Sequence, residues 1–143
     1  MYDSNSLDKE KALASQALWD ENLKQYRKEF EKNSNKLTKR LLKIITSPYL
    51  HDALIIDVHV FTQQIRSKSM SNITVRFSHN ESEGMITYYD VKNVTMDISK
   101  LQDVRYLYGE LLFSNDRLWT HGILLTDGEI SITCKRLDWI PSK

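Results

Sequence analysis

Two histidines and two carboxylates are the side chains of this sequence best suited to acid–base chemistry. Asp57 and His59 alternate within one apolar run, and Glu110 and His121 lie in two later runs of the same kind. If the elements that carry them curl toward each other, the four groups could exchange protons with RNA or an ester, as in a hydrolase. A small hydrolase that uses the His59 and His121 region is therefore one alternative function. Histidines on a half-exposed sheet face are, however, ordinarily solvated or paired with a neighbour.

The adjacent pair His51-Asp52 invites comparison with the His-Asp pair of metal phosphohydrolases. A metal site needs several ligands that converge from different elements. The sequence contains no HxxxH, CxxC or HExxH spacing to supply them. We therefore expect this pair to hydrogen-bond local backbone at a turn between a helix and a strand. No catalytic residue, metal or cofactor is predicted.

A basic cluster marks the N-terminal third of the chain, with eight cationic residues between positions 24 and 43 and only two acidic ones, Glu29 and Glu31. Nucleic-acid binding needs such a patch. Tyr26 and Phe30 are interleaved with it, but they belong to the apolar stripe of the helix, so a solvated helix face is the simpler expectation. A nucleic-acid or regulatory binding module on this basic face is a further alternative. The cationic residues are Lys24, Arg27, Lys28, Lys32, Lys36, Lys39, Arg40 and Lys43.

The elements that must position these residues change character at Ser47-Pro48. Before it, apolar residues recur at helical spacing and predict helix between residues 7 and 46. Either one long helix continues through 33–35 or, as we prefer, two helices meet there, with Ser34 or Asn35 capping the second. Proline then ends the helical part. The stripe expected to face the core is made of Trp19, Leu23, Tyr26, Phe30, Leu37, Leu41 and Ile44.

After Pro48 the apolar residues alternate at strand spacing. Leu54, Ile56, Val58 and Val60 share one face of the first run, which we expect to be the most buried strand of the sheet. Asp127-Gly128, between two alternating runs, is the strongest hairpin signal. Strands joined by such short turns are antiparallel. The predicted strands cover residues 54–61, 73–78, 85–91 with a possible extension through Met96, 107–113, 118–125 and 129–136.

These patterns predict an α+β fold, with N-terminal helices packed on an antiparallel, meander-like sheet of about six strands. The 143 residues, 41% of them hydrophobic, suit a single domain, 1–143, with a helical part at 1–47 and a sheet at 48–143. The formal net charge of +1 creates no overall field that would attract nucleic acid or an acidic membrane.

Several features indicate a cytoplasmic protein. Cys134 is the only cysteine, which fits a reducing compartment. The first 22 residues lack the basic region and apolar run of a secretory signal. No stretch approaches the roughly 18 to 20 apolar residues that a membrane-spanning helix needs. We therefore expect a cytoplasmic protein without membrane association, while its oligomeric state stays open.

Three segments carry a resemblance to a group of proteins: YLHDALI, YGELLF and HGILLTDGEISITCKRLDWI, which together fall within residues 49 to 140. The chain resembles small uncharacterised α+β proteins of Gram-positive bacteria, some of which are encoded as immunity partners of polymorphic toxins. The resemblance implies a protein-interaction module without enzymatic activity, most simply an immunity protein that binds and neutralises a cognate toxin, such as a nuclease.

The sequence also indicates where such a partner would bind. Interface cores favour aromatic residues over Lys and Glu, and carboxylates would complement a basic toxin. Because neighbouring residues of a strand point to opposite faces, one of two adjacent tyrosines should lie outside the core. The predicted partner-binding residues are Tyr88, Tyr89, Asp90, Glu110, Trp119, Asp127 and Glu129.

Overall fold

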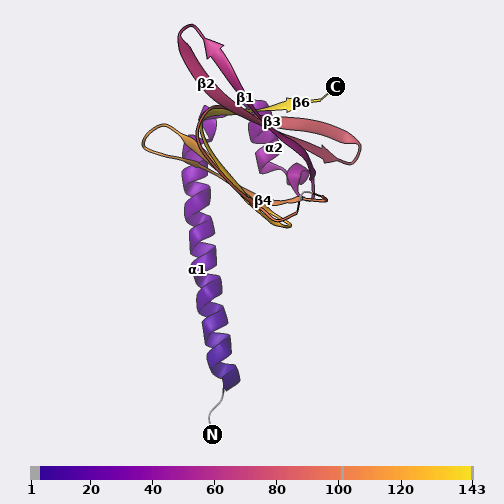
Figure 1. Ribbon diagram of the computed structural model, residues 1–143. Coiled ribbons are helices and arrows are strands. Elements are labelled where there is room, and N and C mark those ends of the chain that lie inside the picture. Colours follow the sequence, from indigo (N-terminus) through magenta and orange to yellow (C-terminus); the bar gives the residue numbers. More distant parts are fainter. Residues whose placement is uncertain (1–3, 101, 143) are drawn as a thin grey trace.

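The computed structural model describes residues 4–100 and 102–142, with side chains from residue 9 onward. It confirms the predicted α+β fold, in which two α-helices precede an antiparallel sheet of six strands (Figure 1). The helical elements are α1 (Ser4–Asn33), η1 (Ser34–Lys36), α2 (Lys39–Thr46) and η2 (Pro48–Leu50). The strands are β1 (Leu54–Ile65), β2 (Lys68–His79), β3 (Ser82–Ile98), β4 (Tyr106–Phe113), β5 (Trp119–Leu125) and β6 (Gly128–Pro141).

The sheet consists of two three-stranded meanders side by side, in the order β1-β2-β3-β6-β5-β4. Each strand pairs with its successor except at the junction of the two meanders, where β3 pairs with β6. Gly84 faces Pro141 at one end of this pairing, and Ile98 faces Gly128 at the other. The sequence predicted a simple continuation from β3 to β4. Instead the two longest strands pair with each other, and β4 lies at the far edge of the sheet.

The two outer strands meet at one end, so the sheet curls. An isolated bridge joins Leu54 to Arg105, just before β4. Around it the Asp52 amide donates to the Tyr106 carbonyl at 2.8 Å, and the Ile55 amide donates to the Val104 carbonyl at 2.9 Å. This junction brings the start of β1 close to the start of β4.

The expectation that β1 is the most buried strand is wrong. It is an edge strand, and Ile56 in its apolar run retains 38% of its surface exposed. Alternation of apolar residues reports which face of a strand turns inward, but it carries no information on how many neighbouring strands lie beside it. The central strands β3 and β6 occupy the position that the sequence assigned to β1.

Two helices are present, as expected, but the second is capped elsewhere. The chain continues from α1 into the 3-10 turn η1, and the Leu37 amide donates to the Ser34 carbonyl. Thr38 is the extended residue before α2, and its hydroxyl accepts from the Leu41 amide at 3.3 Å. Ser34 and Asn35 lie within the turn, so Thr38 rather than either of them caps α2.

The predicted apolar stripe faces the core over only part of its length. Leu41 is fully buried, and Leu23, Tyr26 and Phe30 are half-buried. Trp19, however, is 56% exposed, which corrects its assignment to the core. A helix of 30 residues is about 45 Å long, and α1 extends well beyond the sheet that its C-terminal half contacts (Figure 1).

The core lies inside the curved sheet and beneath α2. Val75, Ile86, Tyr88 and Ile132 come from its inner strands and are fully buried.

Asp138 of β6 fixes α2 to the sheet, because Arg40 Nε donates to its Oδ1 at 3.1 Å and the Thr38 hydroxyl donates to the same oxygen. Burial alone would raise the pKa of Asp138, but these hydrogen bonds hold it below its usual value.

Candidate functional site

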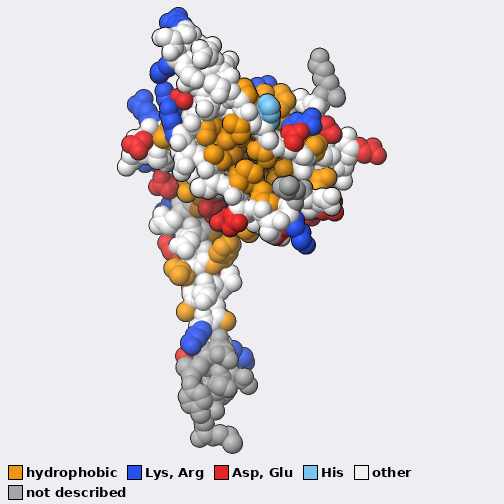
Figure 2. Space-filling model, in the orientation of Figure 1, with side chains coloured by type: hydrophobic (Ala, Val, Ile, Leu, Met, Phe, Trp, Pro, Cys, Tyr) orange, Lys and Arg blue, Asp and Glu red, His pale blue; other side chains and the backbone are white. Residues whose placement is uncertain are grey.

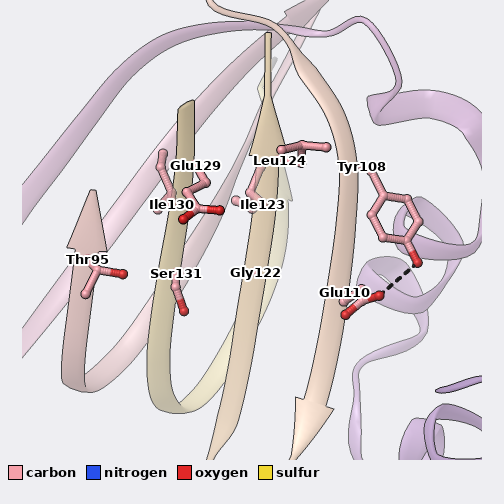
Figure 3. A pocket seen from close by; sticks show the side chains of 9 residues that line it. All are labelled: Thr95, Tyr108, Glu110, Gly122, Ile123, Leu124, Glu129, Ile130 and Ser131. Carbon is pink, nitrogen blue, oxygen red and sulfur yellow. Dashed lines mark hydrogen bonds between the residues drawn. The ribbon is translucent and has the colours of Figure 1, made fainter. Parts of the chain in front are cut away.

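A shallow hollow of about 320 Å³ opens on the face of the sheet formed by β3, β6, β5 and β4 (Figure 3). Figure 3 shows its lining side chains arranged around Gly122, which contributes none of its own. We call it the Gly122 hollow. Its lining residues are Thr95, Tyr108, Glu110, Gly122, Ile123, Leu124, Glu129, Ile130 and Ser131.

The strand register explains this hollow. Gly122 lies between Glu110 of β4 and Ser131 of β6, and Ser131 pairs in turn with Thr95 of β3. A Cβ atom added to Gly122 would meet no other atom within 4 Å. The missing side chain therefore leaves open space in the middle of a row of four strands, and no packing requirement accounts for glycine there.

The neighbouring row across the same strands adds apolar surface and further carboxylates. Tyr108 pairs with Leu124, Leu124 with Glu129, and Glu129 with Asp97. Tyr108 and Leu124 are both exposed, as are Asp97 and Glu129. This face therefore combines an aromatic ring, an aliphatic side chain and three carboxylates counting Glu110.

Tyr108 and Glu110 act as a hydrogen-bonded pair at the side of the hollow. The Tyr108 hydroxyl donates to Glu110 Oε1 at 3.1 Å (Figure 3). Partial burial and the adjacent Glu110 carboxylate raise the pKa of Tyr108 to about 12. The phenol thus stays protonated at neutral pH, which leaves Glu110 as an acceptor with a second oxygen free of this bond.

Helix α1 holds this side of the sheet in place. The Tyr26 hydroxyl accepts a hydrogen bond of 3.0 Å from the backbone amide of Leu111, on the outer edge of β4. Burial raises the pKa of Tyr26, with the nearby Glu110 carboxylate acting in the same direction. The helix therefore covers the edge of β4 beside the hollow and satisfies a backbone donor that would otherwise face solvent.

Of the seven predicted partner-binding residues, two line the Gly122 hollow: Glu110 and Glu129. Asp127 lies at the adjacent β5–β6 turn, where its carboxylate accepts from the Ser99 hydroxyl at 2.7 and 2.8 Å. The structure therefore brings Glu110 and Glu129 to one hollow, whereas Asp127 lies outside it at the neighbouring turn.

The remaining predicted residues do not belong to this region. Tyr88 is fully buried and Trp119 only 3% exposed, so both are corrected from partner-binding to core residues. Tyr89 points to the other face, as its adjacency to Tyr88 required, and stacks under the Arg136 guanidinium at 4.2 Å. Asp90 has a left-handed backbone at a bulge in β3, and its carboxylate accepts from Lys92 at 3.1 Å.

The proposed acid–base residues do not face a common space. His121 is buried, and its Nδ1 lies 2.6 Å from the Tyr88 hydroxyl, while burial lowers its pKa to about 3. His59 is exposed on β1 and stacks on Phe61. Asp57 accepts from Arg76 at 2.9 Å, and Glu110 lines the hollow on β4. Three strands separate β1 from the β5 strand that carries His121.

The expectation that the pair His51-Asp52 hydrogen-bonds local backbone is corrected, because its partners are remote in sequence. His51 Nδ1 lies 3.0 Å from the Leu107 carbonyl. Asp52 has a left-handed backbone conformation, and its carbonyl accepts from Arg105 at 2.8 Å. The pair therefore fastens the start of β1 to the start of β4. Among the side chains that the structure describes, residues 9–100 and 102–142, no group of three or more potential metal ligands gathers.

The basic residues of the helical region are divided among three elements, because Lys36 lies in η1, between the residues of α1 and those of α2. Arg40 is engaged with Asp138, and the Lys36 ammonium lies 4.9 Å from the centre of the Phe113 ring. Lys24, Arg27 and Lys28 remain exposed on α1, beside Asp20 and Glu31. That face of α1 is therefore mixed in charge.

Sequence reasoning missed three residues that shape the hollow: Tyr108, Gly122 and Leu124. Tyr108 could have been found, because it alternates with Glu110 in the predicted strand YGELLF and must share its face. Gly122 carries a weaker signal, namely a glycine within an otherwise apolar strand. Leu124 resembles any core leucine, and only the strand order shows that its face is uncovered.

No protein-family model matches the chain, and no curated protein sequence is similar to it. Neither α-helix in the described part of the chain combines the length and apolar content that crossing a lipid bilayer would require.

Proposed function

We propose that this protein is an interaction module that binds a basic protein partner in the Gly122 hollow, and that it acts as an immunity protein which neutralises a cognate toxin. The observation that carries the proposal is an open hollow in which both charged lining residues, Glu110 and Glu129, are carboxylates. It acts by binding rather than by catalysis, in the cytoplasm, where the buried thiol of Cys134 stays reduced.

The chemistry of the hollow suits the recognition of a cationic side chain. Carboxylates arranged around an apolar depression attract an Arg or Lys and accept its hydrogen bonds once it is inserted. Tyr108 and Leu124 supply the apolar contact that an inserted side chain needs along its methylene stem. A toxin that cleaves nucleic acid carries such cations around its active site, because it must bind phosphates.

The rigidity of the hollow also favours binding. Its residues stand on four hydrogen-bonded strands, and the β4 edge is held by Tyr26. A preorganised surface loses little conformational entropy when a partner binds, so more of the contact energy appears as affinity.

The test begins with the neighbouring reading frames, because the absence of a toxin gene there would count against the proposal. Binding to a toxin found there is then measured by titration calorimetry for the intact protein and two charge-reversed variants. Glu110→Lys with Glu129→Lys should weaken binding by at least about tenfold, because two attractive contacts become repulsive. Lys28→Glu with Lys32→Glu, a matched pair on α1, should leave the affinity unchanged. Circular dichroism confirms that each variant folds.

A third variant tests the hollow by its shape. Gly122→Leu places a Cβ that meets no atom within 4 Å, and we expect the rest of the leucine side chain to occupy the hollow. Loss of toxin binding in Gly122→Leu, together with loss in the glutamate variant, supports the proposal. Loss confined to the lysine variant, or salt-dependent binding of a labelled RNA in place of a protein, would reject it in favour of the basic helix face.

A further inference from the structure

The outer edge of β1, from Asp57 to Ile65, has no neighbouring strand in the described chain. Beyond the bridge at Leu54, β1 pairs only with β2, and the sheet ends there. Backbone amides and carbonyls along such an edge are ready to pair with another strand. We call this segment the β1 edge.

The β1 edge lacks the protection that natural edge strands usually carry. No lysine, arginine, acidic residue or proline occurs from Val58 to Ile65. The single bulge lies at its beginning, between Ile55 and Asp57, and the register with β2 is regular from there on. The opposite edge of the sheet differs, because the Tyr26 hydroxyl of α1 caps the Leu111 amide of β4. The β1 edge is therefore long and regular, and it carries no charged residue after Asp57.

Apolar surface adjoins this edge. Val60 is 63% exposed, and a second hollow of about 300 Å³ opens between Ile55–Val58 and the inner face near Met96 and Ile98. Figure 2 shows hydrophobic side chains gathered in the middle of this face of the molecule. An unpaired edge beside an apolar surface gives an incoming strand both backbone hydrogen bonds and side-chain contacts.

We infer that the β1 edge pairs with the β1 edge of a second copy, antiparallel and centred on Val60, to give a two-fold symmetric dimer with a continuous sheet. This surface is separate from the Gly122 hollow, because β1 meets the chain before β4 only near Leu54, and the β1 edge begins after that contact, at Asp57. Each dimer would therefore present two hollows.

Side-chain compatibility selects the register. Centring on Val60 places Phe61 opposite His59 of the second copy, Thr62 opposite Val58, and Asp57 opposite the neutral amide of Gln63. His59 and Phe61 already stack on one face of the strand, so the pairing extends an existing aromatic contact. No two like charges oppose each other, because Asp57 is the one charged residue from Leu54 to Ile65.

The two neighbouring symmetric registers fit less well. Centring on Phe61 would set Asp57 against Ile65, and centring on His59 would set it against Phe61. In both cases a carboxylate would oppose an apolar side chain. The Val60 register instead gives Asp57 an amide donor and buries the most exposed apolar residue of the strand against its own copy.

A disulfide experiment tests this register on the full chain. Opposed residues of antiparallel strands have Cα atoms about 5 Å apart, within the range that a disulfide bridges. Val60→Cys should therefore form a covalent dimer under mild oxidation. Thr62→Cys is the matched control, because its two copies would be offset by four residues, or about 13 Å. Cys134 is fully buried and does not compete.

Sedimentation velocity tests the dimer without a cross-link. The interface would consist mainly of one pair of strands, so we expect it to bury less than the roughly 800 Å² per partner of a standard interface and to dissociate in the micromolar range or weaker. Val60→Lys should abolish association at all concentrations, while Val94→Lys, an exposed position of β3 away from the edge, should not. A monomer at every concentration, or equal cross-linking of Val60→Cys and Thr62→Cys, would overturn the inference.

Discussion

Lowering the pH from 7 to 5 should destabilise this protein, and His121 is the group responsible. Its imidazole is completely enclosed by the core, with Nδ1 bonded to Tyr88 and Nε2 without a hydrogen-bond partner. Burial lowers its pKa from 6.5 to about 3. Between these two pKa values the imidazole binds a proton in the unfolded chain but not in the folded protein. The contribution of His121 to the free energy of unfolding is therefore fully present above about pH 6.5 and is lost progressively as the pH falls toward 3.

The size of this loss in unfolding free energy follows from the part of the interval between the two pKa values of His121 that the pH change covers. Each pH unit within it changes the free energy of unfolding by about 1.4 kcal/mol for one proton. From pH 7 to pH 5 the loss attributable to His121 is therefore about 2 kcal/mol. Asp138 acts in the same direction but in a lower window, because its pKa is held below 3.8 in the folded state. The interval from pH 7 to 5 therefore reports mainly on His121.

Urea unfolding followed by tryptophan fluorescence measures this effect, since Trp119 and Trp139 are both buried. His121→Gln keeps a hydrogen-bond acceptor near Tyr88 and cannot titrate, so its stability should change little over this range. His59→Gln, which replaces an exposed histidine, should retain the pH dependence of the intact protein. A flat profile in the intact protein, or an unchanged slope in His121→Gln, would refute the assignment of the effect to this residue.

Other substitutions test the packing, the hollow and the absence of catalysis. Leu41→Ala should cost roughly 2 to 5 kcal/mol of unfolding free energy, whereas Ile56→Ala, on the exposed edge strand, should cost about 1 kcal/mol or less; equal losses in chemical denaturation would contradict the assigned burial. Gly122→Ala should leave the melting temperature unchanged or slightly higher, because its Cβ meets open space, and a lower value would show an unrecognised packing contact. The purified protein should cleave neither RNA nor a chromogenic ester, and activity that disappears in His59→Ala would replace the binding proposal.

The sequence predicted the individual elements well, because local rules decide them. Alternation located six strands, and Asp127-Gly128 indicated the last hairpin. At that hairpin Gly128 has a positive φ of 119°, and the absence of a Cβ atom leaves room for the Asp97 carbonyl. Both signals depend on residues close together in the chain. The change of period at Pro48 likewise separated the helices from the sheet.

What the sequence did not predict depends on contacts between distant residues. The pairing of β3 with β6 moved β1 from the expected centre to the edge and turned Ile56 toward solvent. The same curled sheet buries Tyr88 and Trp119, which had been predicted from the sequence to bind a partner at the surface. Of the residues that line the hollow, only Glu110 and Glu129 were named from the sequence, for their charge. Their proximity arises only from the register across β5, with Gly122 between them.

The position of β6 in the sheet has a consequence for how the chain folds during its synthesis. β6 joins the β1-β2-β3 meander to the β4-β5 hairpin, yet it is the last of the six strands to leave the ribosome. Until residues 128–141 emerge, β3 and β5 each expose an unpaired edge and the buried face that β6 will cover. A nascent chain halted before Gly128 should therefore be digested readily by a protease, and protection should arise in one late step once Pro141 has cleared the exit tunnel.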